Sequence, residues 1–288
     1  STRTPGARGR QGVQSVEMAG RLLHALADGG QPMMLRDLAA AAAMPPAKAH
    51  RYLVSLIRLG LAEQSPDSGH YELGGFALRL GLASLSQLEP VRVAGPSLAR
   101  LRDATDETAA LAVWGSYGAT VVRWEEARRP VTVNLRVGGV LPLLTSATGR
   151  AFLAWLPREQ TASLLRGELA AAARQRQARG PRSAAAVDAL VRDIRRRGLA
   201  RVDGDLIPGV AAFAAPVFGA GGRLALVLTV LGHGGHFDVR WNGRVAQRLR
   251  AEARALSLRL DVARELGPQG AAPPYVGQVD VRLGAVEE

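Results

Sequence analysis

Cationic and hydroxyl side chains recur along one side of the segment 46–60. At 100° per residue the polar set falls together, and the apolar set falls opposite: Lys48, Arg51, Ser55 and Arg58 against Ala49, Tyr52, Leu53, Leu56 and Leu59. Arginine and lysine donate to the acceptors of guanine, and serine can hydrogen-bond to several partners. The pattern predicts a helix that packs by its apolar side and presents its basic side to a major groove about 12 Å wide. A solvated amphipathic helix is the alternative that spacing alone leaves open.

The elements around this segment favour the first interpretation. Apolar residues at helical spacing predict a helix over 16–28, which Gly29 and Gly30 end. A short alanine-rich helix over 35–43 follows, and Pro45 and Pro46 turn the chain into the basic helix. Two alternating runs, 61–64 and 70–73, flank a turn rich in Ser, Asp and Gly. Three helices followed by a hairpin are typical of a winged helix-turn-helix.

The expected DNA interface extends beyond one helix. The hairpin tip is expected to lie near phosphates or the minor groove, and the basic arm 1–12 is expected to be disordered and to act similarly. The residues expected to contact DNA are Arg36, Lys48, His50, Arg51, Ser55, Arg58, Ser68 and His70.

The rest of the chain predicts an α+β fold. Strands are expected at 108–114, 120–125, 131–137, 140–144, 199–202, 210–218 and 223–231, and helices at 76–88, 97–105, 146–156, 158–169, 184–197 and 239–266. Hairpin-type connections such as 219–222 predict one mostly antiparallel sheet. The expected divisions are a disordered arm 1–12, a DNA-binding domain 13–75, a linker helix 76–95, a larger domain 96–266 and a loose tail 267–288.

Composition narrows the class of protein. The 288 residues are 47% hydrophobic, which supports a real core. The chain has no cysteine, so disulfides, thiolate catalysis and cysteine metal sites are excluded. Formal net charge is +12, yet residues 1–75 carry eight basic and six acidic side chains, so charge does not locate the DNA-binding part. No apolar run is long enough to span a membrane, and no secretory signal is seen, so we expect a cytoplasmic protein.

Six segments, in order, resemble the IclR-type bacterial transcription regulators. They are Gly12-Val13-Gln14-Ser15-Val16, then 44–53 followed by Gly60-Leu61-Ala62-Glu63, then 69–74, 145–154, Arg197-Gly198-Leu199-Ala200 and 209–217. The resemblance covers roughly residues 12–262. It implies a GAF-like effector domain, dimers or tetramers, palindromic operators and small carboxylates or aromatic acids as effectors. The usual Lys-Ser-Thr after the turn proline is replaced here by Pro46-Ala47-Lys48, so the operator sequence cannot be transferred.

The same resemblance implies a ligand site between the sheet and the loop that enters helix 146–156. A helix N-terminus offers free amides and a positive dipole end to a carboxylate. The expected ligand-binding residues are Leu144, Ser146, Ala147, Thr148, Asp203, Ala212 and Thr229. Plain helix capping is the alternative for Ser146 and Thr148, and a solvated turn is the alternative for Asp203. Trp114, Trp124 and Arg136 could face the pocket or the sheet surface.

Two rival functions remain open at this level. The first is an enzyme, but the chain has no Gly-x-Ser-x-Gly elbow and no glycine loop with a lysine, so we expect no catalytic residue and no cofactor. His233 and His236 have no third ligand at useful spacing, so we expect no metal site. The second is a protein-interaction module on a winged-helix scaffold. Changing Lys48 and Arg51 separates the two functions, because a DNA-binding helix would lose DNA binding and an interaction module would not.

Overall fold

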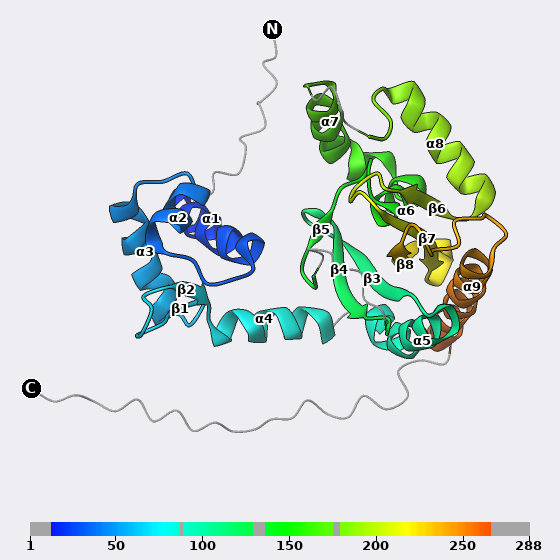
Figure 1. Ribbon diagram of the computed structural model, residues 1–288. Coiled ribbons are helices and arrows are strands. Elements are labelled where there is room, and N and C mark those ends of the chain that lie inside the picture. The colour runs from blue at the N-terminus through cyan, green and yellow to red at the C-terminus, as the bar shows by residue number, and fades with distance from the viewer. Residues whose placement is uncertain (1–12, 87–88, 129–135, 175–178, 266–288) are drawn as a thin grey trace, which may run out of the picture.

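The computed structural model describes residues 13–86, 89–128, 136–174 and 179–265 (Figure 1). The expectations for the arm 1–12 and the tail 267–288 lie outside the described residues, as does most of the strand expected over 131–137.

The N-terminal part is a winged helix-turn-helix, as the sequence predicts. Helices α1 (Gln14–Gly29), α2 (Leu35–Ala41) and α3 (Pro46–Arg58) precede an antiparallel hairpin of β1 (Ala62–Gln64) and β2 (Tyr71–Leu73). Leu22, Leu38 and Leu53 are fully buried, one from each helix, so the apolar stripes of all three helices meet in one core.

Proline sets the start of α3. Pro45 lies in the extended N-cap position and Pro46 begins the helix, where a missing amide leaves no hydrogen bond unmade. Ala49, Leu53 and Leu56 are buried as expected. Leu59 was expected on the buried side and is instead 62% exposed. The helix ends at Arg58, so Leu59 caps its end and leaves the buried stripe.

In the larger part, the described residues form a six-stranded antiparallel sheet covered on both faces by helices (Figure 1). The strand order is β5-β4-β3-β8-β7-β6. The strands are β3 (Thr108–Gly115), β4 (Gly118–Glu125), β5 (Val140–Leu141), β6 (Ala200–Asp203), β7 (Val210–Phe218) and β8 (Leu224–His233). The single antiparallel sheet that the sequence predicts is therefore confirmed.

Alternation along β7 explains the two layers of helices. Ala211, Phe213 and Ala215 join a core with α5 (Glu89–Thr105) and α9 (Arg244–Glu265). Ala212 and Ala214 join a second core with α6 (Ala147–Trp155) and α8 (Ala184–Arg197). Both faces of the central strands are apolar because both are covered. Helix α7 (Arg158–Arg174) follows α6, and α4 (Gly75–Ser86) joins the two parts of the chain.

Several boundaries differ from the expected ones for local reasons. Helix α5 begins at Glu89 and continues through Pro96, because Ala94, Leu98 and Leu101 are buried against the sheet and α9. Helix α9 begins at Arg244 rather than 239, since the Asp238 carboxylate accepts from the amides of Arg240 and Arg244 and holds a turn there. Strand β5 ends at Leu141, three residues before the end of the expected strand 140–144.

Gly149 allows α6 to approach the preceding chain. A Cβ on Gly149 would lie 2.1 Å from the Pro142 carbonyl oxygen and 2.7 Å from the Leu143 Cα. These atoms are backbone, so a larger residue must displace the helix start. By contrast, Gly167 in α7 is exposed and a Cβ there has nothing within 4 Å.

We expect Gly149→Ala to lower the free energy of unfolding of the larger part by about 1–3 kcal/mol, the usual cost of overpacking a close contact. Gly167→Ala is the matched control and should raise it by about 0.5–1 kcal/mol, because alanine is the better helix former. Urea unfolding followed by tryptophan fluorescence measures both, since all four tryptophans lie beyond residue 113. Equal effects of the two substitutions would contradict the role given to Gly149.

Candidate functional site

The basic side of α3 faces outward. Lys48, Arg51, Ser55 and Arg58 are all exposed. The first three line one surface hollow together with Ala47 and Tyr52. Because the opposite side of α3 is buried on α1 and α2, the whole helix is held as a rigid projection with its donors outward. This arrangement suits insertion into a groove of DNA.

The other residues expected at this interface lie around α3 in different settings. Arg36 is exposed and its Nε donates to the neighbouring Asp37 carboxylate at 3.3 Å, so part of its charge is neutralised. His50 is exposed, with Nδ1 3.5 Å from the hydroxyl of the buried Tyr71 on the wing. Ser68 and His70 form the wing tip, where the His70 ring nitrogen lies 3.2 Å from the Ser68 carbonyl oxygen. These four residues lie on α2, on α3 and in the turn of the wing.

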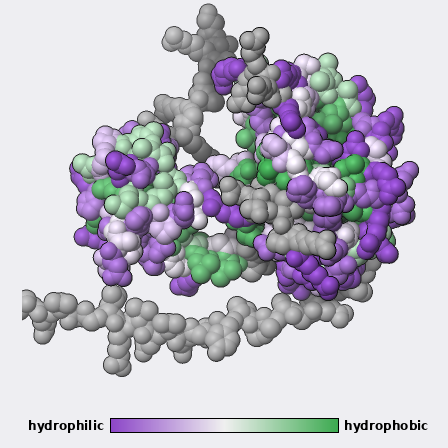
Figure 2. Space-filling view, in the orientation of Figure 1, coloured by the Kyte–Doolittle hydropathy of each residue, from purple (hydrophilic) through white to green (hydrophobic). Residues whose placement is uncertain are grey.

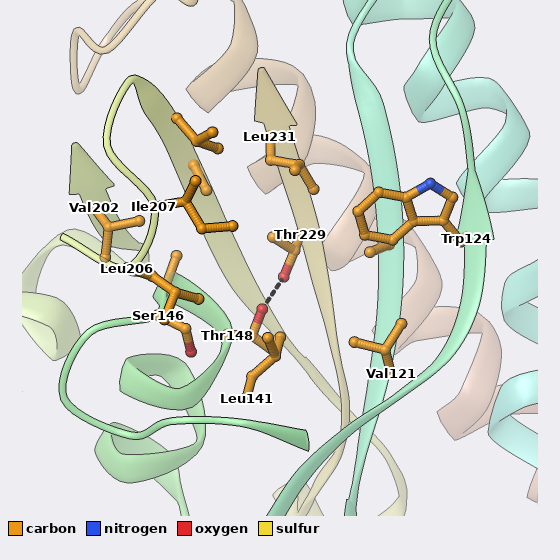
Figure 3. Close-up of a pocket in the computed structure, with 14 residues that line it drawn as sticks. Val121, Trp124, Leu141, Ser146, Thr148, Val202, Leu206, Ile207, Thr229 and Leu231 are labelled. Carbon is orange, nitrogen blue, oxygen red and sulfur yellow. Dashed lines mark hydrogen bonds between the residues drawn. The ribbon is translucent and has the colours of Figure 1, made fainter. Parts of the chain in front are cut away.

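A second candidate site is a pocket between one face of the sheet and the start of α6 (Figure 3). Every strand of the sheet contributes to its lining, and the loop after β6 adds Leu206 and Ile207. The lining residues are Ala110, Val121, Trp124, Leu141, Ser146, Ala147, Thr148, Val202, Leu206, Ile207, Val210, Ala212, Thr229 and Leu231. None of these described lining residues carries a charge.

The hydroxyl groups of the pocket already have partners. Ser146 Oγ accepts from the Gly149 amide at 2.8 Å and donates to the Pro142 carbonyl at 2.6 Å, so it caps α6. Thr148 Oγ1 lies 2.8 Å from Thr229 Oγ1, and both side chains are buried. Within the described residues, the amides of Ala147 and Thr148 have no hydrogen-bond partner. The strongest free donors at the pocket are therefore backbone N–H groups at the positive end of a helix.

Five of the seven expected ligand-binding residues line this pocket, namely Ser146, Ala147, Thr148, Ala212 and Thr229. Leu144 does not, because it packs with Leu143, Leu153 and Val187 in a separate cluster. Asp203 is exposed and also lies outside the lining. The carboxylate that turns toward the domain interior is that of Asp205, which pairs with Arg150 at 3.2 Å.

Of the two tryptophans and one arginine that could face the pocket, one tryptophan lines it and the other two residues lie elsewhere. Trp124 lines the pocket, as Figure 3 shows. Trp114 packs against Phe152, with ring centroids 5.4 Å apart. Arg136 points elsewhere, since its guanidinium donates to the Asp28 carbonyl at the end of α1. Its distance from the pocket removes it as a partner for a bound acid.

The sequence analysis did not identify Leu206 and Ile207, which line the pocket, or Arg150, the buried cation that pairs with Asp205. Leu206 and Ile207 form an apolar pair between Asp205 and Pro208, which is unusual in an otherwise polar turn. Arg150 stands within the apolar stretch 147–154 and is 6% exposed. A charge embedded in an apolar helix signals a buried group with dedicated partners.

The part of the chain that the structure describes holds neither a candidate metal centre nor a helix suited to span a membrane. The rings of His233 and His236 lie 6.2 Å apart, and no group of three or more His, Asp or Glu side chains is placed to hold a metal ion. No helix in this part of the chain combines the length and the apolar character needed to cross a membrane.

Comparison with known proteins gives two family matches. The IclR helix-turn-helix domain matches residues 15–66, and the bacterial transcriptional regulator IclR C-terminal domain matches residues 82–258. The Pca regulon regulatory protein of Pseudomonas putida is 31% identical over 77% of this chain and 72% of its own length. The acetate operon repressor of Salmonella typhimurium is 30% identical, but the match spans 53% of this chain and only 57% of that relative.

Solved structures agree with these matches. The crystal structure of Pseudomonas aeruginosa HmgR is 46% identical, with 86% of this chain and 98% of that chain covered and a TM-score of 0.54. An IclR transcriptional regulator from Alicyclobacillus acidocaldarius shares the fold, with 24% identity, 86% and 99% coverage and a TM-score of 0.71. With its wing, its six-stranded sheet and both domain matches in order, the chain belongs to the IclR family of bacterial transcriptional regulators, which are DNA-binding proteins and not enzymes.

Proposed function

We propose that this protein is a ligand-responsive regulator that binds a palindromic operator and responds to a small organic acid. Residues 13–75 form the DNA-binding domain and residues 96–266 form the sensing domain. Residues 76–95 form the linker between them. The observation that carries the proposal is the division of α3, whose apolar side is buried while Lys48, Arg51 and Ser55 line one outward hollow. Binding to chromosomal operators places the protein in the cytoplasm.

The side chains of α3 and its neighbours fit both base recognition and phosphate contact. Lys48 and Arg51 lie in the first half of the helix, the end that reaches base edges in this type of motif. Arg58, Ser68 and His70 lie where phosphates pass beside an inserted helix, and such contacts position the protein without reading sequence. Arg36, on the preceding helix, serves the same purpose.

We expect Arg51→Ala or Lys48→Ala to weaken operator binding by about 1–3 kcal/mol each, because each removes a donor to base edges. The measurement is a titration of labelled upstream DNA by fluorescence anisotropy at fixed salt, since phosphate contacts make affinity salt-dependent. Arg192→Ala is the control, because Arg192 is an exposed cation of α8 far from α3 in the sequence.

The control should bind within twofold of the unmodified protein, which separates a local contact from the effect of net charge. Unchanged operator binding by the Lys48→Ala, Arg51→Ala double variant would reject α3 as the reader. That result would favour a protein-interaction role for the winged helix.

The pocket is suited to a compact ring that carries one carboxylate. Its apolar walls and the face of Trp124 would bury a ring, while the free amides of Ala147 and Thr148 would receive the anion. A cation is not needed, because the helix start supplies partial positive charge in a dry site. Ala212 and the Thr148–Thr229 pair would form the floor beneath the ring.

One solved structure contains a ligand of this class. A structure of an IclR homolog from Microbacterium hydrocarbonoxydans contains 4-hydroxybenzoate; it is 21% identical to this chain, with a TM-score of 0.70. The HmgR and Pca regulon proteins are the more similar in sequence. We therefore choose 4-hydroxybenzoate as the first probe and a screen of small aliphatic and aromatic acids as the second.

We expect the effective acid to quench the fluorescence of Trp124, and a Trp124→Phe variant to lose that signal. The neutral amide of the same acid should bind at least about tenfold more weakly, because it offers the helix start no charge. Bound acid should also shift the operator titration. Equal affinity for acid and amide, or no shift of DNA binding by any acid that binds, would contradict the proposed sensing role.

A dimer completes the proposal. Helix α4 is apolar on more than one side, and its Phe76, Leu78, Leu80 and Leu82 are 40–64% exposed in the single chain. Figure 2 shows apolar surface at the position of α4. A helix that is apolar all round is normally buried, and two DNA half-sites one helical turn apart require two reading helices. We therefore infer that a second copy of this chain packs against α4.

We expect Leu78→Asp combined with Leu82→Asp to raise the dimer dissociation constant at least about a hundredfold. Each buried leucine contributes about 1.5–3 kcal/mol, and the substitutions place charges in the interface. Analytical ultracentrifugation measures the effect. Arg79→Gln on the same helix is the matched control and should stay dimeric; dissociation of both variants, or of neither, would argue against α4 as the interface.

A further inference from the structure

The loop 203–209 runs from the last residue of β6 to the start of β7 and forms one wall of the pocket. Leu206 and Ile207 project from it over the ligand space (Figure 3). Glycines mark both ends of the loop: Gly204 has φ +73° and Gly209 has φ +76°, conformations that favour glycine. The Gly204 amide donates to the Val210 carbonyl at 2.9 Å, so the loop closes on itself and can move as a unit.

A buried guanidinium holds the start of this loop to the rest of the domain, while the Gly234 amide donates to the Gly209 carbonyl at 2.7 Å at its other end. Arg150 Nε donates to the Leu144 carbonyl and Nη1 donates to the Arg201 carbonyl, each at 2.8 Å. Nη2 lies 3.2 Å from Asp205 Oδ1, and the Arg150 side chain is only 7% exposed. Asp205 Oδ2 in turn accepts from the Asp203 amide at 3.1 Å, which stiffens the loop itself.

Electrostatics favour the closed loop. Burial lowers the pKa of Arg150, and the neighbouring Asp205 carboxylate opposes that shift. Asp205 is therefore the one carboxylate partner of this buried guanidinium among the described residues. Lifting the loop would leave that charge with carbonyl partners alone, which is costly in a dry interior. Arg179 Nη1 adds one further contact, to the Gly204 carbonyl at 2.8 Å.

The position of Arg150 links the loop to the expected anion cradle. It lies on α6, one turn after Ser146, and the free amides of Ala147 and Thr148 begin the same helix. It also holds the Leu144 carbonyl, in the turn that leads into α6, where the Leu143 and Leu144 amides donate to Glu168 at 2.7 and 2.9 Å. The cradle and the contact that closes the pocket thus share one rigid element.

We propose that Arg150 is a positioning residue for effector binding: its ion pair with Asp205 latches the loop 203–209 over the pocket and sets how long the effector stays bound. The inference rests on the proposed sensing function, since it gives a role to that same pocket. The latch does not touch the acid. It keeps Leu206 and Ile207 in place, and they exclude water from the ligand.

The test uses Asp205→Asn in the full-length protein, because the partly exposed Asp205 can lose its charge while Arg150 keeps two carbonyl partners. Asp188→Asn is the matched control: it breaks another Arg–Asp pair of the same domain, with Arg158 at 2.8 Å, which is exposed. Stopped-flow tryptophan fluorescence with 4-hydroxybenzoate should show release at least about tenfold faster in Asp205→Asn, without slower association. The control should match the unmodified protein.

Hydrogen exchange of the ligand-free protein tests the latch without any effector. The amides of 203–209 should exchange at least about fivefold faster in Asp205→Asn and unchanged in Asp188→Asn, while the amides of β7 and β8 remain protected. Arg150→Lys, which keeps the charge but loses the fork, should give the same local change. Unchanged exchange of the loop in both Asp205→Asn and Arg150→Lys would overturn the proposal, as would release at the unmodified rate despite binding.

The two proposals fail differently. If the unmodified protein binds no acid from the screen, the sensing function falls, while loop exchange still decides whether Arg150 and Asp205 hold the loop. If acid binds and the exchange of the loop does not respond, the sensing function stands and the latch is wrong.

Discussion

The start of α6 is the point on which the larger domain depends. Gly149 lets the helix approach the chain at Pro142 and Leu143, Ser146 caps it, and Thr148 bonds across to Thr229 on the sheet. Each contact uses a different atom of one helical turn, so the turn has a single position. That rigidity fixes the unpartnered amides of Ala147 and Thr148 beside the pocket, and on the proposed function this fixed helix dipole receives the anion.

Helix α6 also contains the residue that holds its surroundings in place, Arg150. Arg150 places a buried cation among backbone carbonyls and Asp205, and the apolar residues beside it fill the space between α8 and the sheet. A polar anchor inside an apolar layer is costly unless every donor is satisfied, so it fixes one arrangement of its neighbours. In this domain those neighbours are the turn before α6, strand β6 and the loop over the pocket.

Helix α3 has a simpler arrangement, with one buried apolar side and one exposed polar side. Burial of Leu53 and Leu56 orients α3, and that orientation alone turns Lys48 and Arg51 outward. In the two candidate sites, apolar contacts fix the position of a helix, and a few polar groups supply the hydrogen-bond donors. They differ in where the polar groups lie: at the surface in α3, and at the edge of a closed apolar space in α6.

Local pattern was sufficient for much of this protein. Periodicity places most helices and strands, because each buries one stripe or one face, and it identifies the two sides of α3. Pro45 and Pro46 fix the start of that helix by their own geometry. The capping role of Ser146 is also local, since it involves its own turn.

Tertiary structure decided what depends on distant segments meeting. Whether Leu141 or Leu144 lines the pocket, and whether Asp203 or Asp205 pairs with Arg150, depends on where a strand or turn ends. In a strand, a shift of one residue reverses the side. The continuation of α5 through Pro96 and the roles of Arg150, Leu206 and Ile207 follow from packing that no local pattern contains. Sequence fixes which faces are apolar; only the folded chain decides which faces meet, because that choice minimises exposed apolar area over the whole domain.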